Sequence, residues 1–408
     1  MPEAVIVSTA RSPIGRAGKG SLKDLRPDDL AAQIVRAALD KVPALDPADI
    51  TDLMLGCGLP GGEQGSNLGR IVAEMLGYDH LPGTTVTRYC ASSLQTTRMA
   101  FHAIRAGEGD AFISAGVETV SRFDKGTSDF IPGQDLTNPI FQKAQARTQA
   151  RSAAGAPVWH DPREDGELPD AYIAMGQTAE NVQQLLGISR EEQDVFAVRS
   201  QNLAEAQIDS GFWAREITPT TLPDGSVASA DDGPRRGATL EATSQLQPVF
   251  RPDGTVTAGN ACALNDGAAA LVIMSDAKAK DLGLTPLARI VSTSVTAMSP
   301  EIMGLAPVEA IPAALSNAGM TLDDIDLFEI NEAFAVQVLG SAQRLGIPID
   351  KLNVNGGAIA VGHPFGMTGA RITTTLINSL QWHDKQFGVE SMCVAGGMGM
   401  AMVVERLS

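Results

Sequence analysis

The apolar run AVIVST at Ala4–Thr9 contains the four letters IVST, which recur unchanged at Ile290–Thr293. Further matches follow in the same order: AAL at Ala37–Leu39 and Ala313–Leu315, DI at Asp49–Ile50 and Asp324–Ile325, and MLG at Met75–Gly77 beside RLG at Arg344–Gly346. Any one of these short matches could arise by chance, whereas several in one order indicate an internal duplication. The sequence therefore predicts two similar halves.

The residues around the first copy alternate between strand and helix patterns. Runs typical of buried strands lie at Ala4–Thr9, Thr84–Thr87 and Ala111–Ala115. Helices are predicted at Asp28–Leu39, from its apolar spacing, and at Ser92–Ala106, which Gly107 would end. Such alternation is typical of an α/β domain in which helices pack on a sheet.

The middle of the chain, from about Ser121 to Leu246, is rich in Gln, Asp, Pro, Arg and Gly, with one predicted helical region from about Met175 to Ser210. An insertion of this length is usually functional. Its basic residues stand out against an acidic chain, namely Lys143, Arg147, Arg151, Arg163, Arg235 and Arg236. We predict four parts: 1–120, the first part of an N-terminal α/β half; 121–246, an inserted loop domain; 247–276, the completion of that half; and 277–408, the C-terminal α/β half.

Composition narrows the class of protein. A chain of 408 residues exceeds one ordinary hydrophobic core, so several domains are expected. The net charge of −17 argues against nucleic-acid or membrane-surface binding, although a local basic patch could still hold an anionic ligand. No apolar stretch reaches the roughly 18 residues that a membrane helix needs. The four cysteines form no CxxC pair, which argues against a disulfide scaffold or structural zinc and indicates a reducing compartment, by default the cytoplasm.

The first loop with chemical character is VTRYCASSL at Val86–Leu94. Cys90 lies where a predicted strand turns into a helix, so the amides of the first helical turn point at it and favour a thiolate. A thiolate in this position is a nucleophile suited to acyl transfer. The alternative is a small buried apolar residue, as most free cysteines are.

Three loops of the second half carry polar or reactive residues. In NEAFA, Asn331 could hold a water or a carbonyl and Glu332 could orient a histidine, or the pair could simply begin a helix. His363 lies among glycines in GHPFG, where it could accept a thiol proton, donate to an oxyanion, or form a structural turn. Cys393, in CVAGGMGMA, is either an acid–base thiol or a buried strand residue.

Taken together, a cysteine nucleophile, a histidine base, a second cysteine and an Asn–Glu pair fit acyl transfer through a thioester. Their placement agrees with the duplication, because Cys90 lies in the first half and the other three loops lie in the second. Equivalent loops of two similar halves can meet at one cleft.

These loops resemble the thiolase family (acetyl-CoA acyltransferase, 3-ketoacyl-CoA thiolase), and the similarity runs from end to end. Further matching stretches are AGVETVS at Ala115–Ser121, MGQTAENV at Met175–Val182, GTVTAGNACALNDGAAA at Gly254–Ala270 and GHPFGMTGAR at Gly362–Arg371. The resemblance implies an α/β fold of five layers, α/β/α/β/α, that is duplicated and carries a loop domain inserted in the first half. It also implies a homodimer or homotetramer.

The resemblance implies roles, motif by motif. Cys90 becomes acylated, His363 activates it and helps one oxyanion hole, and Cys393 moves the proton at the α-carbon of the acetyl group. Asn331 positions the water of that hole, with Glu332 as its support.

Backbone amides supply the second oxyanion hole in this resemblance, from Cys90 and from the turn that contains Ala395 and Gly396. Coenzyme A is a co-substrate rather than a permanently bound cofactor, and no metal is implied. The residues expected to contact coenzyme A are Met175, Ala258, Cys262 and Arg235.

Three positions depart from the usual family pattern. Ala395 stands where relatives have glycine, so its methyl restricts φ, but its N–H remains and we expect the hole to survive. Ala174 stands where short-chain biosynthetic members carry a histidine, which favours a longer or branched acyl chain. Cys262 stands where many relatives have a serine against pantetheine, so we expect a weaker hydrogen bond there.

The sequence thus predicts a thiolase that cleaves 3-ketoacyl-CoA with coenzyme A to acetyl-CoA and a shortened acyl-CoA, as in fatty-acid β-oxidation, or runs the reverse Claisen condensation. One alternative is a biosynthetic thiolase that forms acetoacetyl-CoA. A condensing enzyme for carrier-protein thioesters would lack the pairing of NEAFA with the C-terminal cysteine. An inactive lipid-binding relative would have lost Cys90, His363 or Cys393, and all three are present.

Overall fold

The computed structural model describes residues 1–129 and 137–408, so the part of the predicted insertion at 130–136 lies outside the described residues. The strands are β1 (Ala4–Arg11), β2 (Gly15–Arg16), β3 (Asp52–Cys57), β4 (Gly83–Val86), β5 (Ala111–Thr119), β6 (Thr220–Thr221), β7 (Val227–Ala228), β8 (Asn265–Ser275), β9 (Ala288–Ala297), β10 (Leu327–Ile330), β11 (Phe387–Val394) and β12 (Met398–Arg406). The helices are α1 (Pro27–Asp40), α2 (Leu68–Met75), α3 (Ser92–Ala106), α4 (Gln142–Arg151), α5 (Met175–Leu186), α6 (Arg190–Asp209), α7 (Leu240–Ser244), α8 (Asp276–Asp281), α9 (Pro307–Ala318), α10 (Ala335–Leu345), α11 (Ala358–Val361) and α12 (Thr368–Trp382).

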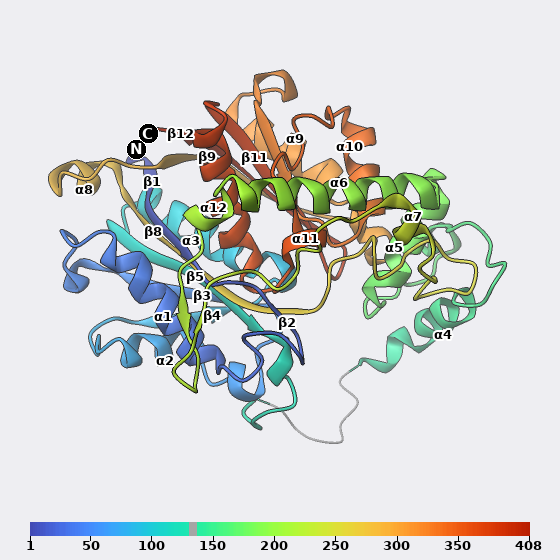
Figure 1. The fold of residues 1–408 in the computed structure, drawn as a ribbon, viewed down its shortest axis with the longest axis horizontal. Coiled ribbons are helices and arrows are strands. Elements are labelled where there is room, and N and C mark those ends of the chain that lie inside the picture. Colours follow the sequence, from blue (N-terminus) through green and yellow to red (C-terminus); the bar gives the residue numbers. More distant parts are fainter. Residues whose placement is uncertain (130–136) are drawn as a thin grey trace.

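The central sheet repeats itself. Within the described chain, ten strands pair in the order β10-β11-β12-β9-β1-β8-β5-β3-β4, with β2 beside β8. In the first half, β3 and β5 are parallel, and the pairs β5–β8 and β8–β1 are antiparallel. In the second half, β10 and β11 are parallel, and the pairs β11–β12 and β12–β9 are antiparallel. The halves join where β1 pairs with β9, the two strands that carry IVST. The predicted duplication is therefore confirmed, and Figure 1 shows the first half in blue and cyan and the second in orange and red.

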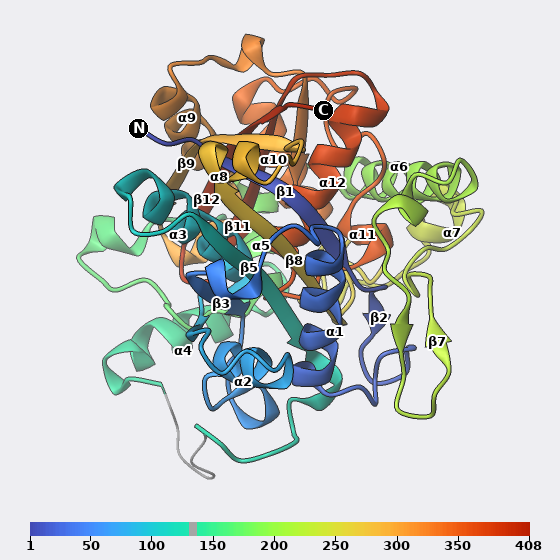
Figure 2. The ribbon, with the colours of Figure 1, turned by 90° about the vertical axis from the view of Figure 1, so that its left-hand side faces the viewer.

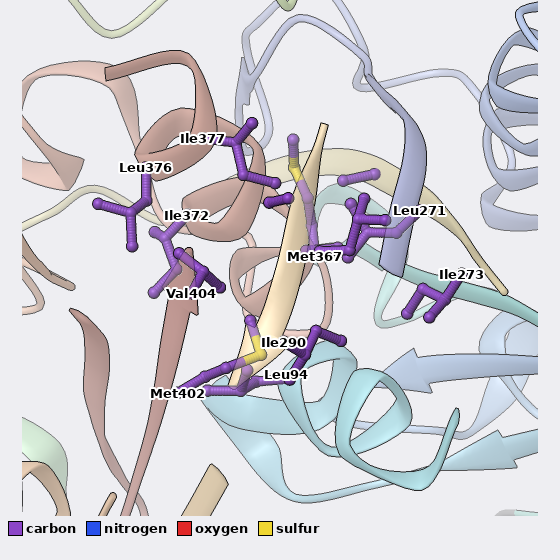
Figure 3. Close-up of a cluster of buried hydrophobic side chains, with 14 of the residues drawn as sticks. Leu94, Leu271, Ile273, Ile290, Met367, Ile372, Leu376, Ile377, Met402 and Val404 are labelled. Carbon is purple, nitrogen blue, oxygen red and sulfur yellow. The ribbon is translucent and has the colours of Figure 1, made fainter. Parts of the chain in front are cut away.

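The two halves of the sheet share a central helical layer. Because side chains alternate along a strand, Ile6 of β1 points into the cluster around α3 and α12, while Val5 and Val7 point into the cluster with α1 and α2. The second half packs its other face against α9 and α10. This is the predicted five-layer α/β/α/β/α arrangement. Figure 3 shows the central cluster, to which α3 contributes Leu94 and α12 contributes Ile372, Leu376 and Ile377.

The amino ends of α3 and α12 touch, and this contact positions the site. A Cβ on Gly369 in the first turn of α12 would lie 2.1 Å from the backbone N of Leu94, so only glycine permits the approach. Next to it, Ala370 N donates to Ser93 Oγ at 2.9 Å. The Cys90 loop directly precedes α3 and the His363 loop directly precedes α12. Because the amino ends of these helices touch, the two loops lie next to each other.

The segment after β5 packs mainly on the second half of the chain. α5 lies against α10 and the short 3₁₀ helix Pro300–Leu305, and α6 lies against α10 and α11. The predicted single helical region is in fact two helices, because Gly187 ends α5 with a φ of 67° and Ser189 begins α6 with a reciprocal cap from Glu192. Figures 1 and 2 show α6 along the outside of the molecule. Within residues 1–129 and 137–408, no helix has the length and apolarity to cross a membrane.

Candidate active site

Cys90 lies in a 3₁₀ turn, Tyr89–Ala91, between β4 and α3. Tyr89 has a φ of 45°, a left-handed value that is costly for a large side chain and that turns the backbone sharply. Ser92 holds the turn, since its Oγ accepts from Arg88 N at 2.9 Å and donates to Tyr89 O at 2.7 Å. The turn presents Cys90 at the amino end of α3, where the sequence predicts it.

Burial dominates the protonation of Cys90. Burial raises the pKa of this thiol to about 12, and the charge of Glu118 acts in the same direction. The backbone N–H groups of Cys90 and Ala395 oppose them and lower the pKa. The Cys90 N–H therefore favours the thiolate, as predicted, but burial raises the pKa more than the amides lower it. Cys90 is a thiol at neutral pH and needs a base to become a nucleophile.

Two further thiols lie within electrostatic reach of Cys90. Cys393 lies in β11 and Cys262 lies shortly before β8. Burial raises the pKa of Cys393 well above its ordinary value and that of Cys262 to about 12, and Cys90 raises both further. Three cysteines from separate segments thus influence one another's pKa, whereas Cys57 at the end of β3 lies beside Glu118.

His363 is buried, and its hydrogen bonds determine its tautomer. Nδ1 lies 2.6 Å from Thr368 Oγ1, and that hydroxyl donates to Pro364 O at 2.8 Å. Because the hydroxyl has one proton, it accepts from His363, so Nδ1 carries the hydrogen and Nε2 carries the lone pair. Burial, helped by the charge of Arg371, lowers the pKa of His363 to about 3. The ring is therefore a neutral base whose Nε2 has no protein partner among the described residues.

Asn331 and Glu332, adjacent in the chain, have different surroundings. Asn331 follows β10, its backbone N–H donates to Ser391 O at 2.9 Å, and both atoms of its buried amide lack a partner within the described part of the chain. Glu332 instead accepts from Ser200 Oγ at 2.6 Å and from Asn353 Nδ2 at 2.8 Å. The expectation that Glu332 orients a histidine is wrong, because Thr368 orients His363 and the Glu332 carboxylate is already occupied.

The turn between β11 and β12 brings Ala395 and Gly396 to Cys90. Ala395 lies outside the left-handed region, so its methyl causes no backbone strain, and its N–H faces the Cys90 thiol. The left-handed positions fall on Gly396 and Gly397, with φ of 80° and 81°. An alanine at position 395 therefore leaves the turn and its N–H donor in place.

A narrow cleft lies between the segment around Arg235 and the His363 loop. Arg235 and Ala258 line it together with Arg16 and with Gly362, the residue before His363. Arg235 also lines a more open hollow between α6 and α7, which continues the cleft outward. Two of the residues predicted to contact coenzyme A thus share one passage.

The other two residues predicted to contact coenzyme A, Met175 and Cys262, lie near Cys393 and the NEAFA segment. Met175 begins α5 and packs on the apolar cluster that includes Phe334 and Cys393. Cys262 N donates to Ala333 O at 3.1 Å, which fixes Cys262 beside the NEAFA segment. In the described residues, no group of three or more His, Cys, Asp or Glu side chains could hold a metal ion.

Thr368 and Glu118 belong to the site although the sequence predicts a role for neither. Both lie inside motif stretches, GHPFGMTGAR and AGVETVS. No spacing rule indicates that Thr368 reaches back to His363 or that Glu118 reaches Gly366 N, at 2.8 Å. Their partners depend on how the loops fold.

Comparison with known proteins agrees with this geometry. The family model "Thiolase, N-terminal domain" matches residues 4–277 and "Thiolase, C-terminal domain" matches residues 284–406. A 3-ketoacyl-CoA thiolase of Bacillus subtilis is 41% identical over 99% of this chain and 100% of its own length. An acetyl-CoA acetyltransferase of Cupriavidus necator is also 41% identical, over 100% of both chains. The crystal structure of the Bacillus anthracis acetyl-CoA acetyltransferase superposes with a TM-score of 0.87 at 38% identity, covering 100% of this chain and 99% of that one. The chain belongs to the thiolase family.

Proposed function

We propose that this acyltransferase cleaves 3-ketoacyl-CoA with coenzyme A, through an acyl-Cys90 intermediate, and can run the reverse condensation. One observation carries the proposal. The buried His363 Nε2 and the buried amide of Asn331 have no protein partner in the described chain. The His363 loop packs on Gly58 below the Cys90 turn, and Asn331 N donates to Ser391 O, two residues before Cys393. Buried polar groups are normally paired, so these atoms are suited to a substrate oxygen or a water beside it.

The first step is attack by Cys90 on the 3-keto carbon. Both partners are neutral at rest, because burial raises the pKa of Cys90 to about 12 and lowers that of His363 to about 3. The proton therefore moves from Sγ to Nε2 as the new S–C bond forms, rather than beforehand. The N–H groups of Cys90 and Ala395 are suited to stabilise the oxyanion that develops on the 3-keto oxygen.

The second step breaks the carbon–carbon bond. The electron pair of the bond passes to the α-carbon as the enolate of acetyl-CoA, whose thioester oxygen is stabilised by protonated His363 and a water on Asn331. Cys393 then protonates the α-carbon. Burial keeps the pKa of Cys393 well above its ordinary value, so it enters this step as the protonated thiol that the donor must be.

The third step releases the shortened chain. The thiol of a second coenzyme A returns a proton to Cys393 and attacks acyl-Cys90, and the leaving Cys90 thiolate recovers its proton from His363. We assign residues 121–246 as the loop domain that binds coenzyme A, supported by the cleft lined by Arg235 and Ala258. Ala174 lies beside Met175 at the start of α5, and the small side chain supports a longer or branched acyl chain.

We also propose a homodimer or homotetramer in a reducing, cytoplasmic setting. β4 lies at one end of the sheet order in the described residues, and Tyr89 and Leu59 beside it are 42% and 44% exposed. An unpaired strand edge with apolar neighbours supports self-association. The four free cysteines support the reducing compartment. Light scattering of Leu59→Glu would test the assembly, since a monomeric variant is expected from this surface.

The test of the function is acylation of Cys90. Incubation with acetyl-CoA, followed by peptide mass spectrometry, should add one acetyl group to the Cys90 peptide and none to the Cys57 peptide. Cys90→Ala should abolish both this adduct and turnover with 3-ketoacyl-CoA. Turnover by Cys90→Ala would refute the proposal.

The role of Cys393 has its own test. Cys393→Ala should still acylate Cys90 but should lose hydrogen–deuterium exchange at the α-carbon of acetyl-CoA. Exchange that persists in this variant would require another base. A panel of 3-ketoacyl-CoA substrates of graded length would then define the preferred chain.

A further inference from the structure

Glu118 is a fully buried carboxylate near the end of β5. It accepts from four N–H donors: Gly58 N at 2.7 Å, Leu59 N at 3.2 Å, Gln64 Nε2 at 2.9 Å and Gly366 N at 2.8 Å. Four N–H donors occupy the two oxygens, and a carboxylic acid proton would face one of them. Burial raises the pKa of Glu118, and these four hydrogen bonds oppose that rise. The donor geometry fits the carboxylate rather than the acid, although no cation pairs with it in the described chain.

On one side, Glu118 fixes the backbone beneath the Cys90 turn. Gly58, which donates to Glu118, accepts through its own O from Thr87 Oγ1 at 2.9 Å. Ser92 Oγ, which holds the Cys90 turn, also lies 3.3 Å from the carbonyl oxygen of the neighbouring Cys57. The carboxylate therefore supports the backbone on which the Cys90 turn rests.

On the other side, Glu118 fixes the His363 loop. Gly366 N donates to the carboxylate three residues after His363, and a Cβ on Gly366 would lie 2.3 Å from Val117 O. A Cβ on Gly58 would lie 2.7 Å from both Phe365 Cβ and Glu118 Oε2. The histidine loop is therefore pressed on the backbone that also supports the Cys90 turn.

We propose that Glu118 is a positioning residue for the reaction, whose carboxylate holds the Cys90 turn and the His363 loop, from opposite halves of the chain, at one fixed separation. The proposal rests on the proposed function, because the separation matters when His363 takes the proton of Cys90. No other buried carboxylate in the described chain accepts from both the backbone below the Cys90 turn and the His363 loop. Its charge also raises the pKa of the Cys90 thiol.

Glu118→Gln is the central variant. An amide has one acceptor oxygen, so its NH₂ group must face two of the four donors, either Gly58 N and Gly366 N or Leu59 N and Gln64 Nε2. In either orientation two N–H donors lose their acceptor and the segments that carry them move apart. A misplacement of about 1 Å costs about 100-fold in rate. We expect kcat to fall about 100-fold while KM changes little, because Glu118 is not among the residues that line the cleft with Arg235 and Ala258.

Glu118→Asp and Glu180→Gln complete the set. Glu118→Asp keeps the charge but withdraws the carboxylate by one methylene, so kcat should also fall, to a smaller extent. Glu180 is a matched buried carboxylate that accepts from the backbone N–H groups of Thr255 and Val256. Thermal unfolding of all three variants reports whether each is folded.

Alkylation of Cys90 without substrate gives a readout that loss of stability would not move. The ratio of the rates with iodoacetate and iodoacetamide cancels accessibility and reports the local charge. Removing the negative charge in Glu118→Gln should raise this ratio about threefold, equivalent to roughly half a pKa unit. Glu118→Asp and Glu180→Gln should leave the ratio at its wild-type value.

The outcomes separate the two proposals. If wild type does not acylate on Cys90, the proposed function fails, while the alkylation ratio still tests whether Glu118 acts on Cys90. If wild type acylates and folded Glu118→Gln keeps its kcat, the positioning role is overturned. The positioning role is also overturned if Glu118→Gln changes only KM and not kcat, or if its alkylation ratio equals that of wild type. Should Glu118→Gln not fold, Glu118→Asp decides by its kcat.

Discussion

Replacing Thr368 by valine would remove the group that sets the tautomer of His363 while keeping the shape of the side chain. Thr368 Oγ1 accepts from His363 Nδ1 at 2.6 Å and donates to Pro364 O at 2.8 Å. Valine can do neither. The buried Nδ1–H then lacks an acceptor, and the proton is favoured on Nε2, where a water or substrate can receive it. In that tautomer, Nε2 cannot take the proton of Cys90.

The magnitude follows from the cost of that unsatisfied donor. A buried donor without a partner costs about 1–3 kcal/mol. If this cost separates the active tautomer from the inactive one, acylation slows by roughly 5- to 160-fold, at 1.36 kcal/mol for each factor of ten. The loss should appear in the acylation rate rather than in binding, because Thr368 is buried behind the ring.

The assay is single-turnover acylation of Cys90 by acetyl-CoA, quenched and quantified by peptide mass spectrometry. Thr374→Val is the matched control, since Thr374 Oγ1 donates to Ala370 O at 2.9 Å in the same helix. It loses the same kind of bond to the backbone but nothing at His363. Thr368→Ser, which keeps the hydroxyl, should restore most of the rate. Equal acylation rates in Thr368→Val and Thr374→Val would refute the tautomer argument.

Three further predictions concern the rest of the molecule. Glu301→Gln should raise the KM for coenzyme A and destabilise the protein by about 1–3 kcal/mol, because this carboxylate accepts from Arg147, Trp159 and Asp170 in the segment between β5 and β6. Saturation kinetics that match wild type would contradict it. Burial raises the pKa of Glu390 from 4.5 to about 8, so its contribution to stability is present below pH 4.5 and is lost as the pH rises through about 8. Glu390→Gln should therefore flatten the decline of Tm between these pH values, whereas the exposed Glu241→Gln should not. Ala395→Gly should lose about 0.5–1 kcal/mol through the unfolded chain without faster acylation, and faster acylation would mean that the methyl crowds the oxyanion hole.

Much of the fold was readable in the sequence because the repeat and the apolar periods are local signals. The helix at Ser92–Ala106 has the predicted bounds. The break between α5 and α6 was missed, although Gly187 and the Ser189 cap both signal it. Both helices lie within the predicted region Met175–Ser210, so only its division into two was missed.

For the candidate site, the sequence predicted the reactive residues but not their protonation. Cys90, His363, Asn331 and Cys393 are conspicuous because few residue types perform acyl transfer. The direction of their pKa shifts was not readable: the helix start predicted a thiolate at Cys90, and burial instead holds it as a thiol. Burial depends on what the rest of the chain places around a residue, and no local pattern encodes it.

The duplication, the α/β class and the identity of the reactive side chains were determined by the sequence itself, since each depends on residue type or on neighbours along the chain. The tertiary structure alone decided which groups support them. Thr368 rather than Glu332 orients His363, and Glu118 joins the loops of the two halves. The bond between Glu118 and Gly366 joins segments 248 residues apart and depends on the approach of the two halves, which glycines permit between α3 and α12. Hydrogen bonds form between whichever donors and acceptors that packing brings within about 3 Å, whatever their separation in the chain.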